Sequence, residues 1–96
     1  MSYYQRSKFS VSNHAILRAR QRIRGLQFLD EVMVRGIILD MLSKIGMPEF
    51  SDSTCDYYRI HGQKDKYLYF VVQRANQLVT TVTPISFEKK YNLLNR

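Results

Sequence analysis

The sequence predicts a small α+β fold in which helices precede an antiparallel sheet. Apolar residues recur at a helical period from about residue 13 to residue 46, and they alternate at the strand period from about residue 54 to residue 83. Short turn signals interrupt the second half, and Pro84 ends its last strand. This order predicts two N-terminal helices and then a meander of three or four antiparallel strands, after which a short C-terminal helix could form.

The first helix is expected from residue 13 to about residue 24. Ser12 precedes it and is a favourable N-cap residue, because its hydroxyl can accept a backbone N–H of the first turn. Gly25 follows it and suits a helix end. Its apolar residues lie opposite part of the arginine set, and they are Ala15, Ala19 and Ile23.

A second helix is expected to begin at Leu29 or Asp30 and to continue to Gly46. Asp30 and Glu31 suit its N-terminus because negative charge there is favourable for the helix dipole. Its wide apolar face predicts that it lies on the sheet. A terminal helix over residues 86–94 would have Ser86 as its N-cap.

Three strands are expected, joined by two short turns. Turns with an even number of loop residues would place alternate side chains of all three strands on common faces. One face would then carry Tyr58, Tyr69 and Val82, and the other would carry Tyr57, Phe70, Thr81 and Thr83. The strands cover residues 57–61, 66–74 and 78–83, and the turns cover residues 62–65 and 75–76.

The chain is expected to be a single domain over residues 1–96, because 96 residues allow only one modest core. Its parts are an N-terminal arm (1–11), a helical half (12–46), a sheet (54–83) and a tail (84–96). One cysteine allows no internal disulfide, and two distant histidines form no zinc pattern. We therefore expect no metal and no cofactor. No apolar run is long enough to cross a bilayer, which favours a cytoplasmic protein without a membrane partner.

Positive charge is concentrated near the N-terminus. Residues 6–24 hold six Lys or Arg residues and no Asp or Glu, which accounts for +6 of the net charge of +7. Such a concentration indicates a polyanionic partner. His14, Arg18 and Arg22 are four residues apart, so a helix would place them on one face. An imidazole in line with two guanidinium groups suits a phosphodiester.

The run from Asn13 to Ile23 (NHAILRARQRI), with the Gly25-Leu26 and Asp30-Glu31-Val32 segments after it, resembles the opening of small bacterial toxin domains. In those domains a pattern HAxxRxxxR precedes a second helix. The later strand segments, YLYFVV and LVTTVT, resemble their closing hairpin. The chain is therefore similar to the barnase, EndoU, colicin and RelE superfamily of ribonucleases. The nearest branch is that of the colicin-D-like and contact-dependent-inhibition tRNases and their uncharacterised relatives.

The resemblance implies an endoribonuclease that needs no metal and acts on tRNA or mRNA. The 2′-hydroxyl would attack the adjacent phosphate and leave a cyclic phosphate and a free 5′-hydroxyl. His14 would be the general acid or base, since histidine titrates near neutrality. Arg18 and Arg22 would hold the phosphate. A hydroxyl from Thr81 or Thr83 would complete the site, and from the sequence we add His61 as a second proton-transfer group.

Further side chains are candidates for nucleic-acid contact. Cations near a basic helix bind the phosphate backbone, and aromatic rings on a sheet stack on unpaired bases. These candidates are Arg20, Arg24, Arg59, Lys64, Lys66 and Tyr57.

Each of these residues also has a purely structural interpretation. His14 could hydrogen-bond a loop carbonyl, and His61 could be an exposed strand-end residue without a role. Alternating arginines cannot all share one helix face, so Arg20 and Arg24 could be solvated surface. Threonines are ordinary strand residues. The tyrosines could be core, and the lysines could guard a strand edge.

Three functions therefore stay open. The first is a toxin-like ribonuclease, which by its resemblance implies an acidic immunity or antitoxin protein that covers the basic site. The second is a binding protein of the same fold that grips RNA or DNA without cleavage. The third is a small phage or mobile-element protein that inhibits an acidic protein partner.

Overall fold

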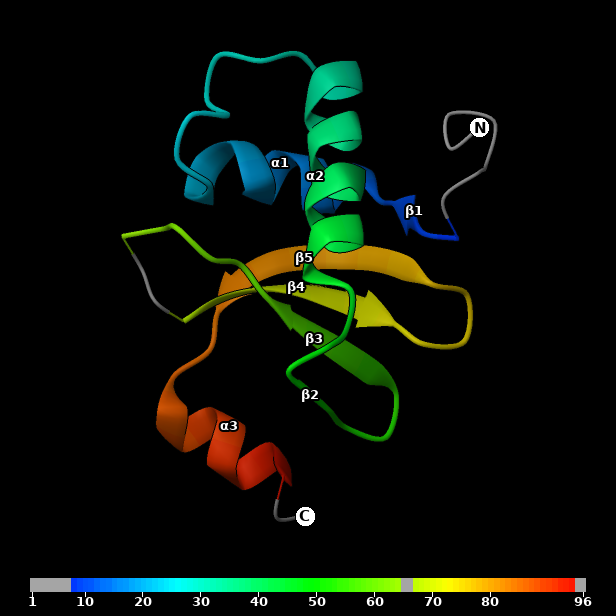
Figure 1. Cartoon of the computed structure of the whole chain (residues 1–96), viewed down its shortest axis with the longest axis vertical. Helices are drawn as coiled ribbons and strands as arrows, with labels where there is room; N and C mark the ends of the chain where they lie inside the picture. Colours follow the sequence, from blue (N-terminus) through cyan, green and yellow to red (C-terminus); the bar gives the residue numbers. More distant parts are fainter. Residues whose placement is uncertain (1–7, 65–66, 95–96) are drawn as a thin grey trace.

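The chain has an α+β fold in which three helices pack on a five-stranded mixed sheet (Figure 1). The structure is a computed structural model that describes residues 8–64 and 67–94. The elements follow the chain in the order β1 (Ser10–Val11), α1 (Asn13–Arg22), α2 (Glu31–Ile45), β2 (Phe50–Ser51), β3 (Cys55–Arg59), β4 (Leu68–Gln73), β5 (Leu78–Pro84) and α3 (Phe87–Leu94).

The sheet has the strand order β1-β5-β4-β3-β2. Strands β3 to β5 form the expected antiparallel meander, and β2 adds to it by pairing antiparallel with β3, but β1 pairs with β5 in parallel, so the sheet as a whole is mixed. The sequence predicted an arm over residues 1–11 and a loop before residue 54, and it missed β1 and β2. Both strands are two residues long, too short for an alternating pattern.

The N-terminal caps of all three helices are formed by residues that the sequence had indicated for this role. Ser12 caps α1, and Asp30 caps α2 by accepting the N–H of Met33. Gly46 ends α2 with φ of 80°, a conformation that favours glycine, and Ser86 accepts an N–H in α3. Helix α1 ends at Arg22, two residues earlier than expected, because Ile23 turns to an extended conformation. None of the helices in the described ranges is long and apolar enough to span a membrane.

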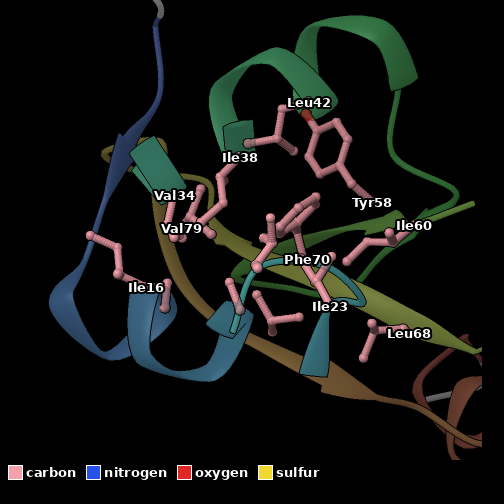
Figure 2. Packing of buried hydrophobic residues seen from close by; sticks show 14 of the residues in the cluster. Ile16, Ile23, Val34, Ile38, Leu42, Tyr58, Ile60, Leu68, Phe70 and Val79 are labelled. Atoms are coloured by element: carbon pink, nitrogen blue, oxygen red, sulfur yellow. The ribbon is translucent and has the colours of Figure 1, made fainter. Parts of the chain in front are cut away.

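The larger core lies between the sheet and helices α1 and α2. Figure 2 shows its side chains meeting from all three sides, with Phe70 at the centre of the sheet face and Ile38 above it. Both are fully buried. The buried members are Ala15, Ile16, Ala19, Ile23, Leu26, Val34, Ile38, Leu42, Tyr58, Ile60, Leu68, Phe70, Val72, Val79 and Val82.

A smaller core covers the opposite face of the sheet, next to α3. Phe50 stacks on Tyr57 with ring centroids 4.5 Å apart, and it meets Tyr69 edge-on at 5.4 Å. Ile85 is buried in the same cluster, and Leu93 of α3 packs on it. The two cores together show that both faces of the sheet are covered.

The predicted division of strand side chains between the two faces was right for β4 and the start of β5, and wrong for β3 and for the part of β5 after Thr80. Tyr58 pairs with Phe70 and Phe70 with Val82, so these three share the α1–α2 face. The β3–β4 connection differs from the expected turn by one residue in register, which moves every side chain of β3 to the other face relative to β4. A bulge at Thr80 shifts β5 in the same way, because Val72 pairs with Val79 whereas Val71 pairs with Thr81.

Glu49 joins the smaller core to the charged rim of the sheet. Its carboxylate accepts a short hydrogen bond from the hydroxyl of Tyr69. It also forms ion pairs with Nζ of Lys90 at 2.9 Å and with Nη1 of Arg59 at 3.6 Å. Partial burial alone would raise the pKa of Glu49. The hydrogen bonds from Tyr69 and Lys90 and the charges of Lys90 and Arg59 outweigh burial, so the pKa lies below its usual value of 4.5. Burial and the neighbouring carboxylate raise the pKa of Tyr69.

This lowered pKa predicts that Glu49 contributes to stability near neutrality and not in acid. A carboxyl with a lowered pKa in the folded state stabilises the fold above its unfolded pKa, and this contribution disappears as pH falls through the folded pKa. Glu49→Gln should therefore reduce the free energy of unfolding at pH 7, and the difference from wild type should shrink below about pH 4.5. Urea unfolding across this range measures it.

The matched control is Glu88→Gln, which removes an exposed carboxylate outside this network. A constant difference between Glu49→Gln and wild type at every pH would contradict the prediction.

Candidate nucleic-acid interface

Ser12 fixes the N-terminal end of α1 to strand β5. Its backbone N–H donates to the carbonyl of Val79 at 3.0 Å, and its hydroxyl donates to the carbonyl of Thr80 at 3.2 Å. The same hydroxyl oxygen accepts the N–H of Ala15 at 3.0 Å and thereby caps the helix. The first turn of α1, which carries His14, is therefore held against a defined part of the sheet.

His14, Arg18 and Arg22 lie in a line along one side of α1, which we call the basic line. Residues four apart on an α-helix are offset by about 40° around the axis and by about 6 Å along it, so the line spans about 12 Å. Ala15 and Ala19 are buried on the neighbouring side of the helix. His14 is exposed, and its imidazole has no hydrogen bond or ion pair within the part of the chain that the structure describes.

Arg22 connects the basic line to the edge of β5. Its guanidinium Nη1 donates to the carbonyl of Val82 at 2.7 Å. Strand β1 covers only the first two residues of β5, so this carbonyl faces away from β4 at an edge that no other described strand pairs with. Pro84, two residues later, has no N–H to expose there. The arginine and the proline both protect the edge from pairing with another chain.

Arg22 also lines an open hollow of about 380 Å³, which lies between the end of α1 and the loop that joins β3 to β4. Figure 1 shows these two segments on the same side of the molecule, the α1–α2 connection in cyan and the β3–β4 loop in yellow-green. The N–H of Arg24 donates to Oε1 of Gln63 at 2.9 Å and so connects them. The lining residues are Arg22, Arg24, Gln27, Gln63 and Lys64, and we call this site the donor hollow.

The polar groups that line the donor hollow are hydrogen-bond donors. Oε1 of Gln63 accepts the N–H of Arg24, and Oε1 of Gln27 accepts the N–H of Gly25 at 3.0 Å. With each oxygen occupied by backbone, each amide has its NH₂ group left to offer. The three cations in the lining have donors only. The hollow therefore suits a ligand made of acceptors, such as a phosphate group.

Carboxylates do not neutralise the arginines of this region. Among the described residues no carboxylate lies within 4.0 Å of Arg18, Arg20, Arg22 or Arg24, whereas Arg18 donates to the side chain of Gln21 at 2.9 Å. The ion pairs found between described residues lie on other elements: Asp40–Lys44, Glu49–Arg59, Asp56–Arg74 and Glu49–Lys90. The charge of α1 is thus left for a ligand.

The structure does not bring the two predicted threonines to His14. Thr81 pairs with Val71 and Thr83 pairs with Tyr69, and both of these partners belong to the smaller core beside α3. Directly opposed residues in a sheet point to the same face. The threonine side chains therefore lie on the face opposite to α1.

The second histidine is also separated from the basic line. His61 is exposed and lines a different hollow, beside the C-terminal half of α2, with Met41, Lys44 and Ile45. Among the residues predicted to be catalytic, only His14, Arg18 and Arg22 lie together.

Two predicted nucleic-acid contacts are occupied by structural roles on the α3 face. Tyr57 is buried, stacks on Phe50, and donates its hydroxyl to Asp52 at 2.6 Å. Arg59 forms the ion pair with Glu49. Tyr57 is therefore a core residue, which is the structural interpretation that the sequence also allowed.

The remaining predicted contacts divide between the hollow and other places. Arg24 and Lys64 line the donor hollow with Arg22. Arg20 is half-buried and lies two residues before Arg22, which on a helix places it on the opposite flank of α1. Lys66 lies outside the described residues.

Sequence reasoning missed the two glutamines of the hollow. Gln63 meets Arg24 across 39 positions of the chain, and no local pattern signals such a contact. Glutamines in polar loops carry no pattern of their own, so only the three-dimensional arrangement shows their role.

A scan against protein-family models and searches of curated proteins and of solved structures found no match for this chain. Within residues 8–64 and 67–94, no group of three or more His, Cys, Asp or Glu side chains could hold a metal ion. The physical arrangement of the interface therefore carries the functional argument.

The position of α1 is expected to depend on the Ser12 hydroxyl. Ser12→Ala removes the N-cap and should lower the free energy of unfolding by about 1 kcal/mol, as N-cap deletions typically do. Urea unfolding measures the change. Ser10→Ala is the matched control, because Ser10 is exposed on β1 and should change stability by less than about 0.5 kcal/mol. Equal losses in the two variants would contradict this role.

Proposed function

We propose that this chain binds the phosphate backbone of RNA along α1 and the β3–β4 loop. One observation carries the proposal: the residues that line the donor hollow are three with cationic side chains and two glutamines, and they come from segments far apart in the sequence. Phosphate oxygens only accept hydrogen bonds, and guanidinium groups bind them in a planar fork. The basic line extends the same positive surface by about 12 Å along the helix.

Removal of charge from the donor hollow should weaken binding and its salt dependence. The double variant Arg24→Gln with Lys64→Gln removes two cations without removing the backbone N–H of Arg24 that binds Gln63. Each lost phosphate contact should lower the slope of log affinity against log salt by about 1. Fluorescence anisotropy with a labelled single-stranded RNA at several salt concentrations measures both quantities.

The matched control is Lys44→Gln with Lys89→Gln, which lowers the net charge equally at positions away from the hollow. Lys44 pairs with Asp40 on α2, and Lys89 is exposed on α3. Equal loss of affinity in both double variants would mean that affinity depends only on the net charge, and it would contradict a specific phosphate site at the donor hollow. Absence of RNA binding by wild type at physiological salt would instead favour an acidic protein as the partner of this surface.

Cleavage of the bound RNA is a second candidate function, favoured by the position of His14. Its exposed imidazole lies one turn from Arg18 on the basic line, so a phosphate held there has a proton-transfer group beside it. In such a reaction the 2′-oxygen attacks the adjacent phosphorus after giving up its proton, and the 5′-oxygen leaves and gains a proton. The products are a cyclic phosphate and a free 5′-hydroxyl, and no metal takes part.

His14→Ala separates cleavage from binding. If His14 transfers a proton, cleavage of tRNA or of ribosome-bound mRNA in EDTA should fall by a factor of about 100 or more. RNA affinity should change little, because the arginines of the basic line remain. Gel analysis of the fragments and detection of cyclic phosphate ends measure the result.

Asn13→Ala is the control for cleavage, since Asn13 is the exposed neighbour of His14 on the same turn. Cleavage that persists in His14→Ala would contradict the catalytic assignment. RNA that stays intact with wild type would leave binding as the function of the surface.

A further inference from the structure

Phe28 is 97% exposed, although it lies between two residues that contact the core. Leu26 is buried, and Leu29 packs on the core immediately before the N-cap Asp30. A hydrophobic residue at this position characteristically packs on the fourth residue of the helix, here Val34, which is also in the core. Leu26 and Leu29 point into the core, and the ring of Phe28 between them is left in solvent.

The turn that carries Phe28 also carries one wall of the donor hollow. The N–H of Leu29 donates to the carbonyl of Leu26 at 3.3 Å, which closes a four-residue turn with Gln27 and Phe28 at its centre. Gln27 lines the hollow. Since neighbouring Cα atoms are about 3.8 Å apart, the residue that carries the exposed aromatic ring is bonded directly to one that lines the hollow.

We propose that Phe28 stacks on an unpaired base of a nucleic-acid strand whose phosphate occupies the donor hollow, so that the site selects single strands over duplexes. This inference rests on the proposed function. A nucleotide joins an acceptor-rich phosphate to a flat ring through one sugar, and the turn carries a glutamine of the hollow and a flat ring on adjacent residues. In a duplex the base faces are stacked on each other and do not reach such a ring.

The position of nearby charges agrees with this orientation. The carboxylate of Asp30 accepts the N–H of Met33 at 2.9 Å and, with Glu31, lies at the start of α2. Phosphate groups are repelled by these carboxylates and attracted to Arg24 and Lys64 at the hollow. The strand is therefore expected to enter from α1 and to end its contact at Phe28.

A single tryptophan can report the stacking directly, because the chain contains none. Phe28→Trp keeps a flat ring at the turn, and its fluorescence should be quenched on titration with a single-stranded RNA oligonucleotide. Phe87→Trp is the matched control, since Phe87 is also exposed, at 69%, but lies on α3 across the sheet. Its fluorescence should not change.

Affinity provides the second readout. Phe28→Leu keeps an apolar side chain but removes the flat ring, and stacking is worth about 1–3 kcal/mol per base, so single-strand affinity should fall by about 5- to 150-fold. Phe28→Trp should retain it. In wild type, affinity for a duplex of the same sequence should be weaker than affinity for the single strand. In Phe28→Leu, the affinities for the duplex and for the single strand should be nearly equal.

Two results would overturn the inference. One is full single-strand affinity in Phe28→Leu, and the other is no quenching in Phe28→Trp. With either result, an effect of Arg24→Gln with Lys64→Gln on RNA binding would keep the phosphate site and reject only the stacking. Exposed Val32 and Met33 on α2 would then favour a protein partner for this turn. No RNA binding by wild type at all would reject the proposed function itself.

Discussion

The close packing of α1 on β5 determines where the candidate site residues of this helix lie. Ala15 and Ala19 are fully buried at this contact, and alanine has no side chain beyond Cβ, so the helix can approach the strand closely. Ser12 fixes one end of the helix to the β5 backbone, and Arg22 binds the same backbone near the other end. Because the helix is held at both ends, the side chains between them keep a fixed direction relative to the sheet. A larger residue at position 15 or 19 would displace the helix and, with it, the wall that Arg22 and Arg24 give to the donor hollow.

The features that local chemistry determines could be predicted from the sequence. Helix caps are read directly from the residue types, as at Ser12 and Asp30, and a run of alternating apolar residues is sufficient to predict strands β3 to β5. The face that each strand presents could not be predicted, because it depends on the parity of every turn and on bulges. The bulge at Thr80 follows from backbone pairing with β4 and leaves no mark in the residue types around it. Strand β1 was missed for a similar reason, since two residues that pair in parallel with β5 have no pattern of their own.

The same distinction explains which parts of the candidate site were predicted. The spacing of His14, Arg18 and Arg22 is a property of one helix, so their common side follows from the helical period alone. The predicted threonines depended on the register of β5, and the one-residue shift places them on the α3 face. Lys64 was a candidate only for its charge, and its meeting with Arg22 depends on how the β3–β4 loop folds against the end of α1. The positions of residues within one element were predictable, and the loop contacts that bring distant residues to the donor hollow were not.

The distribution of charge explains why an anion at the α1 surface would relieve repulsion between its cations. Like charges four residues apart on a helix are unfavourable by a few tenths of a kcal/mol per pair, and α1 has one such pair, Arg18 and Arg22, without an acidic residue in its first turn. Arg20 and Arg22 in the last turn recover part of this cost through the helix dipole, and Arg22 recovers more through its bond to Val82. The acidic residues Glu49 and Asp56 are paired with other cations at the β2–β3 side of the sheet and do not offset the rest. An anion bound along α1 supplies the compensation that the chain itself does not, so ligand binding and stability of the helix are coupled.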